Sequence, residues 1–573
     1  MYESEFEKNL YQQRRDKLAE IARLGHATYP NSYLFSHSIP ELRGAFDALT
    51  AEQLQADLAL GRKIEVSIAG RIMALRVQGK AGFAQLQQAG QRFQIYVRKD
   101  DVGENLFALY KLLDLGDHVG VRGYLFRTRT GELTVHVSQI TLASHEGKPA
   151  LTFLAKAMLA LPDKYHGLED TELRYRQRYV DLFMNTGATR LVSASSATDP
   201  AASQVTEEAD ETPNVREVFV KRAAILRAIR KFFDARNYLE VETPMMHQVA
   251  GGAAAQPFTT HHNALDLDLF LRIAPELYLK RLIVGGLDRV YEINRNFRNE
   301  GISTRHNPEF TMLEFYQAYA NYHDLMDLTE EFITFVAQEV NGSLITTFNG
   351  NEIDLSKWTR LSMREAILHF WPDVAGAKPH FDSFTTKESI TALIQQLRSA
   401  KIRIEYDPKE PLGKTIATIF ETVAESHLIQ PTIIYDFPLA VSPLSKIKPD
   451  ELYWVERFEF YIGGFEVGNA FSELNDPDDQ RARFEQQMTE KQRGDKEAHH
   501  MDEDYVRALG YGLPPTAGEG IGIDRLTMLL TNSKSIRDVI LFPLLRPQAK
   551  QAALGEVRPG ESAGGSFAPA TPE

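Results

Sequence analysis

One polar segment between two apolar stretches combines several cations with an aromatic ring. It runs from Arg295 to Glu300 and continues to Arg305, His306 and Phe310. The planar guanidinium of arginine binds two phosphate oxygens at once, and an aromatic ring can stack on a flat base. Because a hairpin with a polar loop can place such groups over one ligand, the segment predicts a phosphate and base site. A surface loop with ion pairs is the alternative.

Glycines alternate with other residues at Gly518, Gly520 and Gly522, and Arg525 follows at the start of an expected helix. The pattern fails the dinucleotide fingerprint GxGxxG, because the last glycine is missing and no parallel βαβ unit surrounds it. Alternate glycines suit a strand whose backbone approaches a ligand closely. An anion is favoured at the helix start, and a base could lie between Phe310 and Arg525.

Five glutamates stand in apolar segments, where an unpaired carboxylate is costly. They are Glu276, Glu314, Glu459, Glu466 and Glu473. Several carboxylates close together need cations, and either Mg²⁺ shared with nucleotide phosphates or a substrate ammonium group meets that need. An ordinary ion pair explains any one of them better, whereas the whole set favours a binding site.

The elements that must position these residues mix helices with long strands. Residues 220–238 have apolar residues at helical spacing, and residues 239–246 are expected to hold a strand that ends at Pro244. Further strands are expected within residues 289–300, 309–320 and 457–474. Strands joined as hairpins favour an antiparallel sheet flanked by helices, an α+β fold.

The N-terminal part of the chain follows a different pattern. Residues 3–25 are expected to form an amphipathic helix, and five short alternating strands fall between residues 62 and 143. That number of strands predicts a small β-barrel such as an OB-fold, which binds oligonucleotides. Residues 61–140 hold 12 Lys and Arg against 7 Asp and Glu, which supports nucleic-acid binding. A barrel with merely solvated basic edges is the alternative.

The changes of composition predict six segments along the chain. These are an N-terminal helical region (1–60), a barrel domain (61–145), a linker or hinge (146–184), a low-complexity insertion (185–214), a catalytic domain (215–546) and a disordered tail (547–573). The insertion and the tail contain few large apolar residues, so neither is expected to pack a core. A solvated loop is the favoured interpretation of the insertion, ahead of a partner-binding segment.

The composition is that of an ordinary globular enzyme. The chain has 573 residues and a formal net charge of −14, which argues against coating nucleic acid by bulk charge. It contains no cysteine, so disulfides, cysteine-based zinc sites and thiol catalysis are excluded. No apolar run is long enough to span a bilayer, and the first residues are charged, so a cytoplasmic enzyme without membrane contact is expected.

Taken together, these segments resemble class II aminoacyl-tRNA synthetases, and most closely the bacterial-type lysyl-tRNA synthetases. The resemblance runs from the N-terminal helix to about Pro547, apart from the insertion. The helix and strand that end at Pro244, the FRNE segment and the GIGIDR segment match the three class II signatures. The resemblance implies an OB-fold barrel that binds the anticodon, followed by a class II antiparallel catalytic sheet.

The resemblance also implies a reaction, its partners and residue roles. Lysine would be activated by ATP as lysyl-adenylate and transferred to the 3′ end of tRNA(Lys), with up to three Mg²⁺ ions accompanying ATP and a homodimer formed through the segment ending at Pro244. The implied roles are catalysis (Arg298, Arg525), ATP binding (Arg298, Glu300, Arg305, His306, Phe310, Arg525), lysine binding (Glu276, Glu314, Tyr316, Asn469, Phe471, Glu473), Mg²⁺ binding (Glu459, Glu466) and anticodon binding (Arg71, Phe83, Gln94, Glu132).

One position departs from the family pattern, and three other interpretations compete with it. Gln256 stands where the family usually has arginine, near the loop over the expected active site. An aspartyl- or asparaginyl-type enzyme would need cations in the amino-acid pocket, where carboxylates are expected. A relative that lysylates proteins would lack the barrel. A non-catalytic RNA-binding relative would lack Arg298, Arg525 or the acidic residues.

Overall fold

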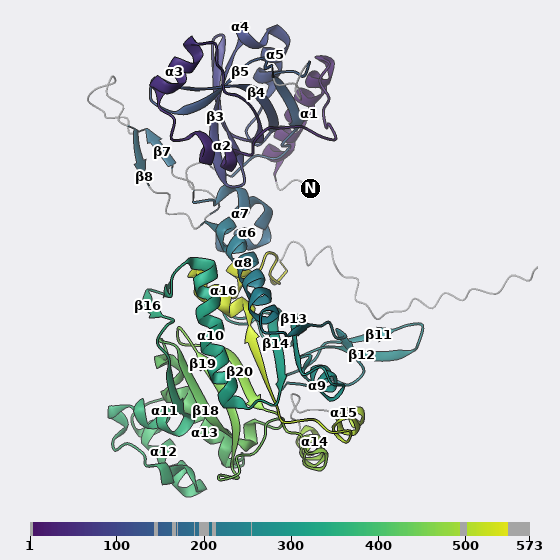
Figure 1. The fold of residues 1–573 in the computed structure, drawn as a ribbon, viewed down its shortest axis with the longest axis vertical. Coiled ribbons are helices and arrows are strands. Elements are labelled where there is room, and N and C mark those ends of the chain that lie inside the picture. Colours follow the sequence, from purple (N-terminus) through teal and green to yellow (C-terminus); the bar gives the residue numbers. More distant parts are fainter. Residues whose placement is uncertain are drawn as a thin grey trace, which may run out of the picture. The chain divides into compact units, whose positions relative to one another are not determined.

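The computed structural model describes residues 4–141, 147–162, 168, 170–187, 190–193, 205–208, 214–253, 255–492 and 501–547. The chain divides into two compact units, Met1–Val220 and Lys221–Glu573. Figure 1 shows a barrel in the first unit and a large sheet with flanking helices in the second.

The first unit contains the predicted five-stranded barrel. Its strands are β1 (Glu65–Gln78), β2 (Ala81–Gln88), β3 (Gln91–Arg98), β4 (His118–Arg127) and β5 (Leu133–Val137). They pair in the order β1-β2-β3-β5-β4, and β4 pairs back with β1 to close the barrel. A sixth strand, β6 (Leu151–Ala155), extends the sheet from β4 and was not predicted. The barrel therefore confirms the predicted strands and adds one.

Short helices surround the barrel. The predicted N-terminal helix is α1 (Glu5–Arg23), and α2 (Ile39–Phe46) and α3 (Ala51–Ala59) begin at the capping boxes of Ser38 and Thr50. Helices α4 (Lys99–Val102) and α5 (Glu104–Leu112) connect β3 to β4. Apolar side chains of the strands and of α1, α2, α3 and α5 form one core.

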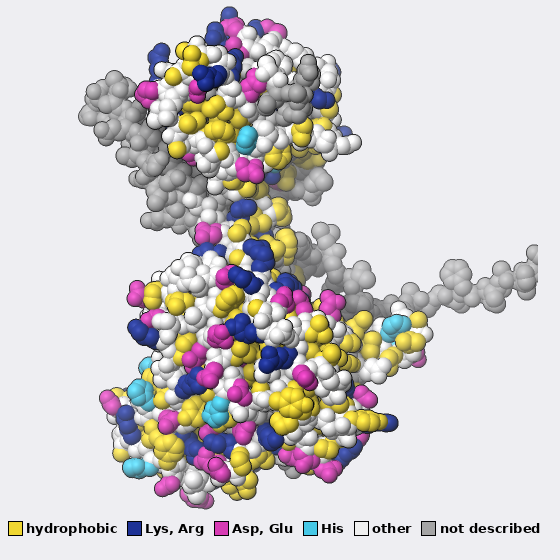
Figure 2. All heavy atoms as spheres, in the orientation of Figure 1, with side chains coloured by type: hydrophobic (Ala, Val, Ile, Leu, Met, Phe, Trp, Pro, Cys, Tyr) yellow, Lys and Arg dark blue, Asp and Glu magenta, His cyan; other side chains and the backbone are white. Residues whose placement is uncertain are grey.

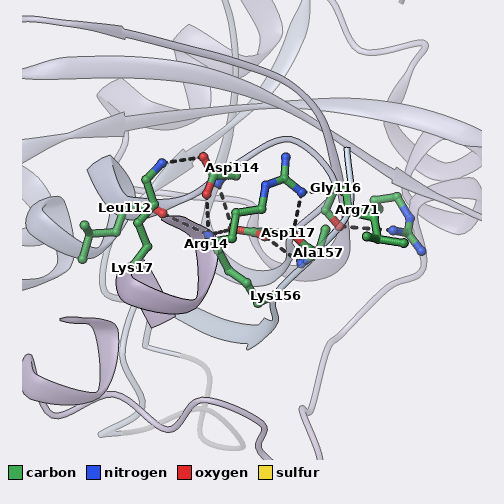
Figure 3. Close-up of polar contacts among 10 residues, drawn as sticks. Arg14, Lys17, Arg71, Leu112, Asp114, Gly116, Asp117, Lys156 and Ala157 are labelled. Carbon is green, nitrogen blue, oxygen red and sulfur yellow. Dashed lines mark hydrogen bonds and ion pairs between the residues drawn. The ribbon is translucent and has the colours of Figure 1, made fainter. Parts of the chain in front are cut away.

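A buried ionic cluster connects α1 to the end of the barrel (Figure 3). The side chain of Lys156 is fully buried, and its ammonium lies 2.8 Å from Asp117 and 2.7 Å from Asp114. Lys17 of α1 contacts Asp114 at 2.6 Å, and Arg14 donates to the carbonyl oxygen of Ala157 at 2.5 Å. Because Lys17 and Lys156 lie beside carboxylates and Arg14 donates to backbone carbonyl oxygens, the cluster can hold α1 in place.

The end of the first unit partly contradicts the sequence interpretation. Helices α6 (Thr171–Arg176) and α7 (Arg178–Met184) follow the barrel. The predicted insertion, 185–214, was expected to be a loop, but β7 (Arg190–Ser193) and β8 (Val205–Glu208) pair as antiparallel strands within it. Apart from residues 185–187 and 214, the rest of the insertion lies outside the described residues, as does the tail except for its first residue.

The second unit is built on an eight-stranded sheet with the order β17-β18-β19-β20-β21-β14-β13-β9. The central pairs from β18 to β13 are antiparallel, as predicted, and the two edge pairs are parallel. The strands are β9 (Leu239–Glu240), β13 (Arg289–Phe297), β14 (Glu309–Ala318), β17 (Thr359–Ser362), β18 (Thr432–Pro438), β19 (Trp454–Tyr461), β20 (Glu466–Ser472) and β21 (Thr516–Gly522). Smaller sheets contain β10 (Met246–His247), β11 (Thr259–His262) and β12 (Leu267–Leu271), and β15 (Ile345–Phe348) with β16 (Asn351–Asp354).

Helices pack against this sheet or against the helices that cover it (Figure 1). They are α8 (Val215–Asp234), α9 (Glu276–Val284), α10 (Tyr322–Asn341), α11 (Met363–His369), α12 (Lys387–Ser399), α13 (Leu412–Val423), α14 (Pro477–Gln492), α15 (Glu503–Leu509), α16 (Ile523–Thr531) and α17 (Ile536–Val539). Phe315 of β14 packs against Phe233 of α8, and Glu519 of β21 accepts a hydrogen bond from Thr329 of α10 at 2.9 Å. These contacts assign one face of β14 and β21 to the helices and leave the opposite face for the site.

Charged side chains of both signs are mixed on the face of the second unit seen in Figure 2. Among the described residues, no helix combines the length and the apolar character needed to cross a bilayer.

Candidate functional site

Two rows of residues cross the open face of the sheet and bring the predicted site together. In the first row, the strand register aligns Glu459, Asn469, Gly520 and Glu314. In the second row, it aligns Arg457, Phe471, Gly518 and Tyr316. Because paired residues in an antiparallel ladder lie directly opposite each other, strands that are far apart in sequence place these side chains in a single layer.

Glycines leave the middle of both rows without side chains. Gly518, Gly520 and Gly522 share one face of β21, since alternate residues of a strand point the same way. A Cβ built on Gly518 would lie 2.2 Å from the ring of Tyr316 and 2.5 Å from Oε1 of Glu473. The glycines therefore form the floor of a pocket, as their spacing predicted.

The pocket collects most of the residues predicted to bind ATP and lysine. It is lined by Glu276, Arg298, Glu300, Arg305, His306, Phe310, Glu314, Tyr316, Glu466, Asn469, Phe471 and Arg525. Two predicted residues do not line it. Glu473 lies behind the floor next to Lys280, and Glu459 is engaged with Arg457 and Tyr461.

The cationic side of the pocket consists of Arg298, His306 and Arg525. Arg298 makes no ion pair with any described residue, its guanidinium lies 5.0 Å from the ring centre of Phe310, and burial lowers its pKa. Arg525 contacts the carboxylate of Glu466 at 3.0 Å and a ring nitrogen of His306 at 3.2 Å. Burial and the charge of Arg525 lower the pKa of His306. An arginine without a carboxylate partner suits an anionic ligand.

The acidic side of the pocket holds three buried carboxylates and one buried ammonium. Lys280 lies 2.5 Å from Glu276 and also contacts Glu473. Burial raises the pKa of both glutamates, and the charge of Lys280 opposes that rise. Among the described residues, Glu314 makes no ion pair, and its carboxylate accepts a hydrogen bond from the amide of Asn296 at 3.5 Å. Burial, with the charge of Glu276 next, raises the pKa of Glu314 to about 8.

A further buried network lies beside the pocket around Arg457. Its guanidinium contacts Glu459 at 2.6 Å and donates to the side-chain oxygen of Asn469 at 2.8 Å. Burial raises the pKa of Glu459 to about 7, and the charge of Glu466 contributes to that rise. Within the described ranges, no three His, Asp or Glu side chains are grouped as a metal cage. Two neighbouring carboxylates still suit a cation that also binds phosphate oxygens.

Three of the four predicted anticodon residues share the outer face of the barrel. The side-chain amide of Gln94 donates to Glu132 at 2.6 Å. Phe83 is partly exposed, and its ring lies 4.8 Å from that of Tyr96. Figure 2 shows hydrophobic side chains gathered on the barrel in the region of β3. Arg71 instead lies over the ring of Phe183 at 4.3 Å, and its contacts do not include the other three.

Sequence reasoning missed Lys280 and Arg457. The signal for Lys280 was its place one helical turn after Glu276, and the signal for Arg457 was its place two residues before Glu459 on the same strand face. Gln256 does lie against the FRNE loop, where its backbone carbonyl accepts a hydrogen bond from the amide of Asn299 at 2.7 Å. That contact does not depend on the side chain.

The comparisons with known proteins agree for both units. Residues 199–546 match the family described as class II tRNA synthetases (D, K and N), and residues 66–143 match the OB-fold nucleic acid binding domain. A lysine–tRNA ligase of Moorella thermoacetica is 48% identical over 95% of this chain and 99% of its own length. The lysine–tRNA ligase of Xanthomonas oryzae pv. oryzae is 49% identical over 95% of this chain and 97% of its own. The heat-inducible enzyme of Escherichia coli K12 is 48% identical over 93% and 96%.

The glycine floor can be tested with Gly518→Ala. The added methyl group overlaps Tyr316 and Glu473, so we expect a loss of about 1–3 kcal/mol in the free energy of unfolding. Gly522→Ala is the matched control on the same strand, because its Cβ meets nothing closer than 3.5 Å. Thermal unfolding followed by circular dichroism measures both, and equal midpoints for the two variants would contradict the close packing at Gly518.

Proposed function

The chain belongs to the class II lysyl-tRNA synthetases, and we propose that the pocket of its second unit activates lysine with ATP. The lysyl group is then transferred to tRNA, whose anticodon is bound by the barrel. The reaction as a whole is the ATP-dependent formation of lysyl-tRNA. One observation carries the residue assignment. Arg298, which makes no ion pair with any described residue, and the buried carboxylates lie around the same glycine floor.

The acidic side supports selection of a cationic amino acid. Glu276 is assigned to the α-ammonium group of lysine, and Glu314, Tyr316 and Glu473 to its ε-ammonium group, with Asn469 and Phe471 as the wall. A buried ammonium group needs compensating charge and hydrogen bonds, and these residues supply both. An apolar amino acid would leave the acids unpaired, and an aspartate would add a like charge. The aspartyl alternative therefore lacks the cations it needs in this pocket.

The first step joins the lysine carboxylate to ATP. A carboxylate oxygen attacks the α-phosphorus in line, the bond to the β-phosphate oxygen breaks, and pyrophosphate leaves. Arg298 is assigned to the α-phosphate and the lysine carboxylate, and Arg305 and His306 to the outer phosphates. Adenine is assigned to the space between Phe310 and Arg525, with Glu300 on the adenine or ribose side. No protein nucleophile is needed, since positioning and charge stabilisation lower the barrier.

The second step transfers the lysyl group. A ribose hydroxyl of the terminal adenosine of tRNA attacks the lysyl carbonyl carbon and loses its proton to solvent, the bond from that carbon to the phosphate oxygen breaks, and AMP leaves with the bonding electrons. Arg298, beside that phosphate, can stabilise the charge that returns to it.

Magnesium ions fit the carboxylates beside the phosphate side of the pocket. We assign Glu459 and Glu466 to them. The raised pKa of Glu459 is the behaviour of a buried acid that lacks sufficient positive charge around it. Two carboxylates without a third protein ligand are typical of magnesium sites completed by nucleotide phosphates. Mg²⁺ would supply neutralisation of charge on the phosphate oxygens.

Several further assignments complete the proposal. Phe83 stacks on an anticodon base, and Gln94, Glu132 and Arg71 contact the neighbouring bases.

Two copies of the chain associate through the segment that ends at Pro244. In and directly after this segment, Leu239, Met245 and Met246 are about half exposed. We propose the bounds of the six predicted segments as the domain bounds of the chain. We propose the cytoplasm as the location of the protein.

The central test is amino-acid-dependent ATP–pyrophosphate exchange across the twenty amino acids. We expect lysine to support exchange, and Arg298→Ala to lower the lysine-dependent rate by about 100-fold or more, the usual cost of losing one transition-state donor. Arg289→Ala is the matched control, because this exposed arginine at the start of β13, the strand that precedes Arg298, donates its one described side-chain hydrogen bond to the carbonyl of Arg236. Near-normal exchange by the Arg298 variant would contradict the assignment.

The pKa of Glu314 predicts how lysine binding depends on pH. With a pKa of about 8, Glu314 carries a proton at pH 6.5, and a bound ammonium group favours its ionised form. Lysine must then displace that proton, so the KM for lysine should fall about tenfold per pH unit as pH rises, and level off near pH 8. The KM for ATP serves as the internal control. A Glu314→Gln variant should lose this dependence, and a variant with the unchanged pH profile would contradict the role of Glu314.

The barrel assignment is tested with Phe83→Ala. Loss of one base stack of about 1–3 kcal/mol should raise the KM for tRNA by about 5- to 100-fold and leave lysine-dependent exchange unchanged. Phe6→Ala removes another exposed phenylalanine from the same unit and should change neither. If adenylate formation falls instead, Phe83 has a structural role.

A further inference from the structure

Lys280 is a fully buried charge that the reaction described above does not use. It lies on α9 one turn after Glu276, and its ammonium contacts Glu276 at 2.5 Å and also Glu473. The ring of Phe471 lies 5.3 Å away. Its side chain has no exposed surface and does not line the pocket. Lys280 is therefore positioned behind the two carboxylates, on the side away from the ligand.

One carboxylate lines the pocket, and the other lies directly behind its floor. Glu276 lines it directly. Oε1 of Glu473 borders the floor at Gly518, and it accepts no hydrogen bond from any described residue. The backbone of Glu473 is fixed by a hydrogen bond of 2.8 Å to the carbonyl of Thr516. Glu276 thus contacts Lys280 and lines the pocket, whereas Glu473 contacts Lys280 and directs Oε1 toward the floor at Gly518.

The two glutamates depend on this shared cation. Two carboxylates this close to each other would otherwise repel and retain a proton. Burial alone would neutralise Lys280, but the charges of Glu276 and Glu473 offset that effect and hold its pKa above the ordinary value. Lys280 therefore stays charged, and it ties together one carboxylate from α9 and one from the chain that follows β20.

We propose that Lys280 is a positioning residue for amino-acid selection, since its ammonium holds Glu276 and Glu473 at a fixed separation that matches the two ammonium groups of lysine. The inference rests on the proposed function, which assigns the α-ammonium to Glu276 and the ε-ammonium to Glu473. Ornithine is one methylene shorter and cannot reach both carboxylates while they are held. A difference of one methylene is worth about 10- to 200-fold in specificity when a site is well defined.

The test compares lysine with ornithine in ATP–pyrophosphate exchange. In Lys280→Met, which keeps the length of the side chain but removes the charge, kcat/KM for lysine should fall by about 100-fold, mostly through KM, and the lysine-to-ornithine ratio should drop below about 10. The KM for ATP should stay within about threefold, because Lys280 does not face the nucleotide side. A ratio equal to that of the parent protein would overturn the proposal, even where thermal stability is lower.

Lys280→Arg provides a second, independent variant. It keeps the charge, so it should regain more of the lysine affinity than Lys280→Met, but its longer planar group should leave the ratio reduced. Should Lys280→Met fail to fold, this variant decides the question, and full selectivity in it would overturn the proposal.

Lys156→Met is the matched control. Lys156 is equally buried and also contacts two carboxylates, Asp114 and Asp117, but it belongs to the first unit. The control should lower thermal stability and leave the lysine-to-ornithine ratio unchanged. If the parent protein shows no lysine-dependent exchange, the proposed function itself is refuted. If the parent protein is active but the Lys280 variants keep its lysine-to-ornithine ratio, only this inference is refuted.

Discussion

The lack of side chains along one face of β21 is the constraint on which the site depends. Antiparallel pairing places β20 and β14 on either side of β21, and their side chains stand around the gap that Gly518 and Gly520 leave. A Cβ at Gly518 would occupy the space between Tyr316 and Glu473. The register therefore determines which residues lie opposite each other, and the glycines leave the space between them free of side chains.

The carboxylates in this arrangement need positive charge near them. Glu276, Glu314 and Glu473 are all buried, and Lys280 contacts only the first and the last of them. A buried carboxylate without a partner is strongly penalised, which is why the pKa of Glu314 rises so far. A ligand that brings positive charge relieves this penalty. The charge of the pocket alone thus favours a cationic amino acid, apart from any hydrogen bond to the side chain of that amino acid.

The sequence predicted the residues better than it predicted their connections. Its place in an apolar strand was enough to single out Glu314, the glycine spacing indicated the floor, and Tyr316 was named only through the family resemblance. Lys280 was missed because its second partner, Glu473, is separated from it by almost two hundred positions in the chain, and only tertiary packing brings them together. Strand β6 was missed because its pairing with β4 depends on barrel closure rather than on a local pattern. Arg71 carries the charge expected of a nucleic-acid contact, yet packing directs it onto Phe183.

The net charge of the chain conceals two opposite requirements. Phosphate recognition by the barrel needs exposed cations, since counterion release occurs at the surface. Recognition of a small cation needs acids removed from water, because exposed charges are screened within about 8–10 Å at physiological ionic strength. One surface cannot meet both demands without the charges neutralising each other. Residues 61–140, with their basic excess, and the buried acids of the second unit satisfy these demands in separate compact units. The overall charge of −14 is therefore a poor guide to the partners of either one.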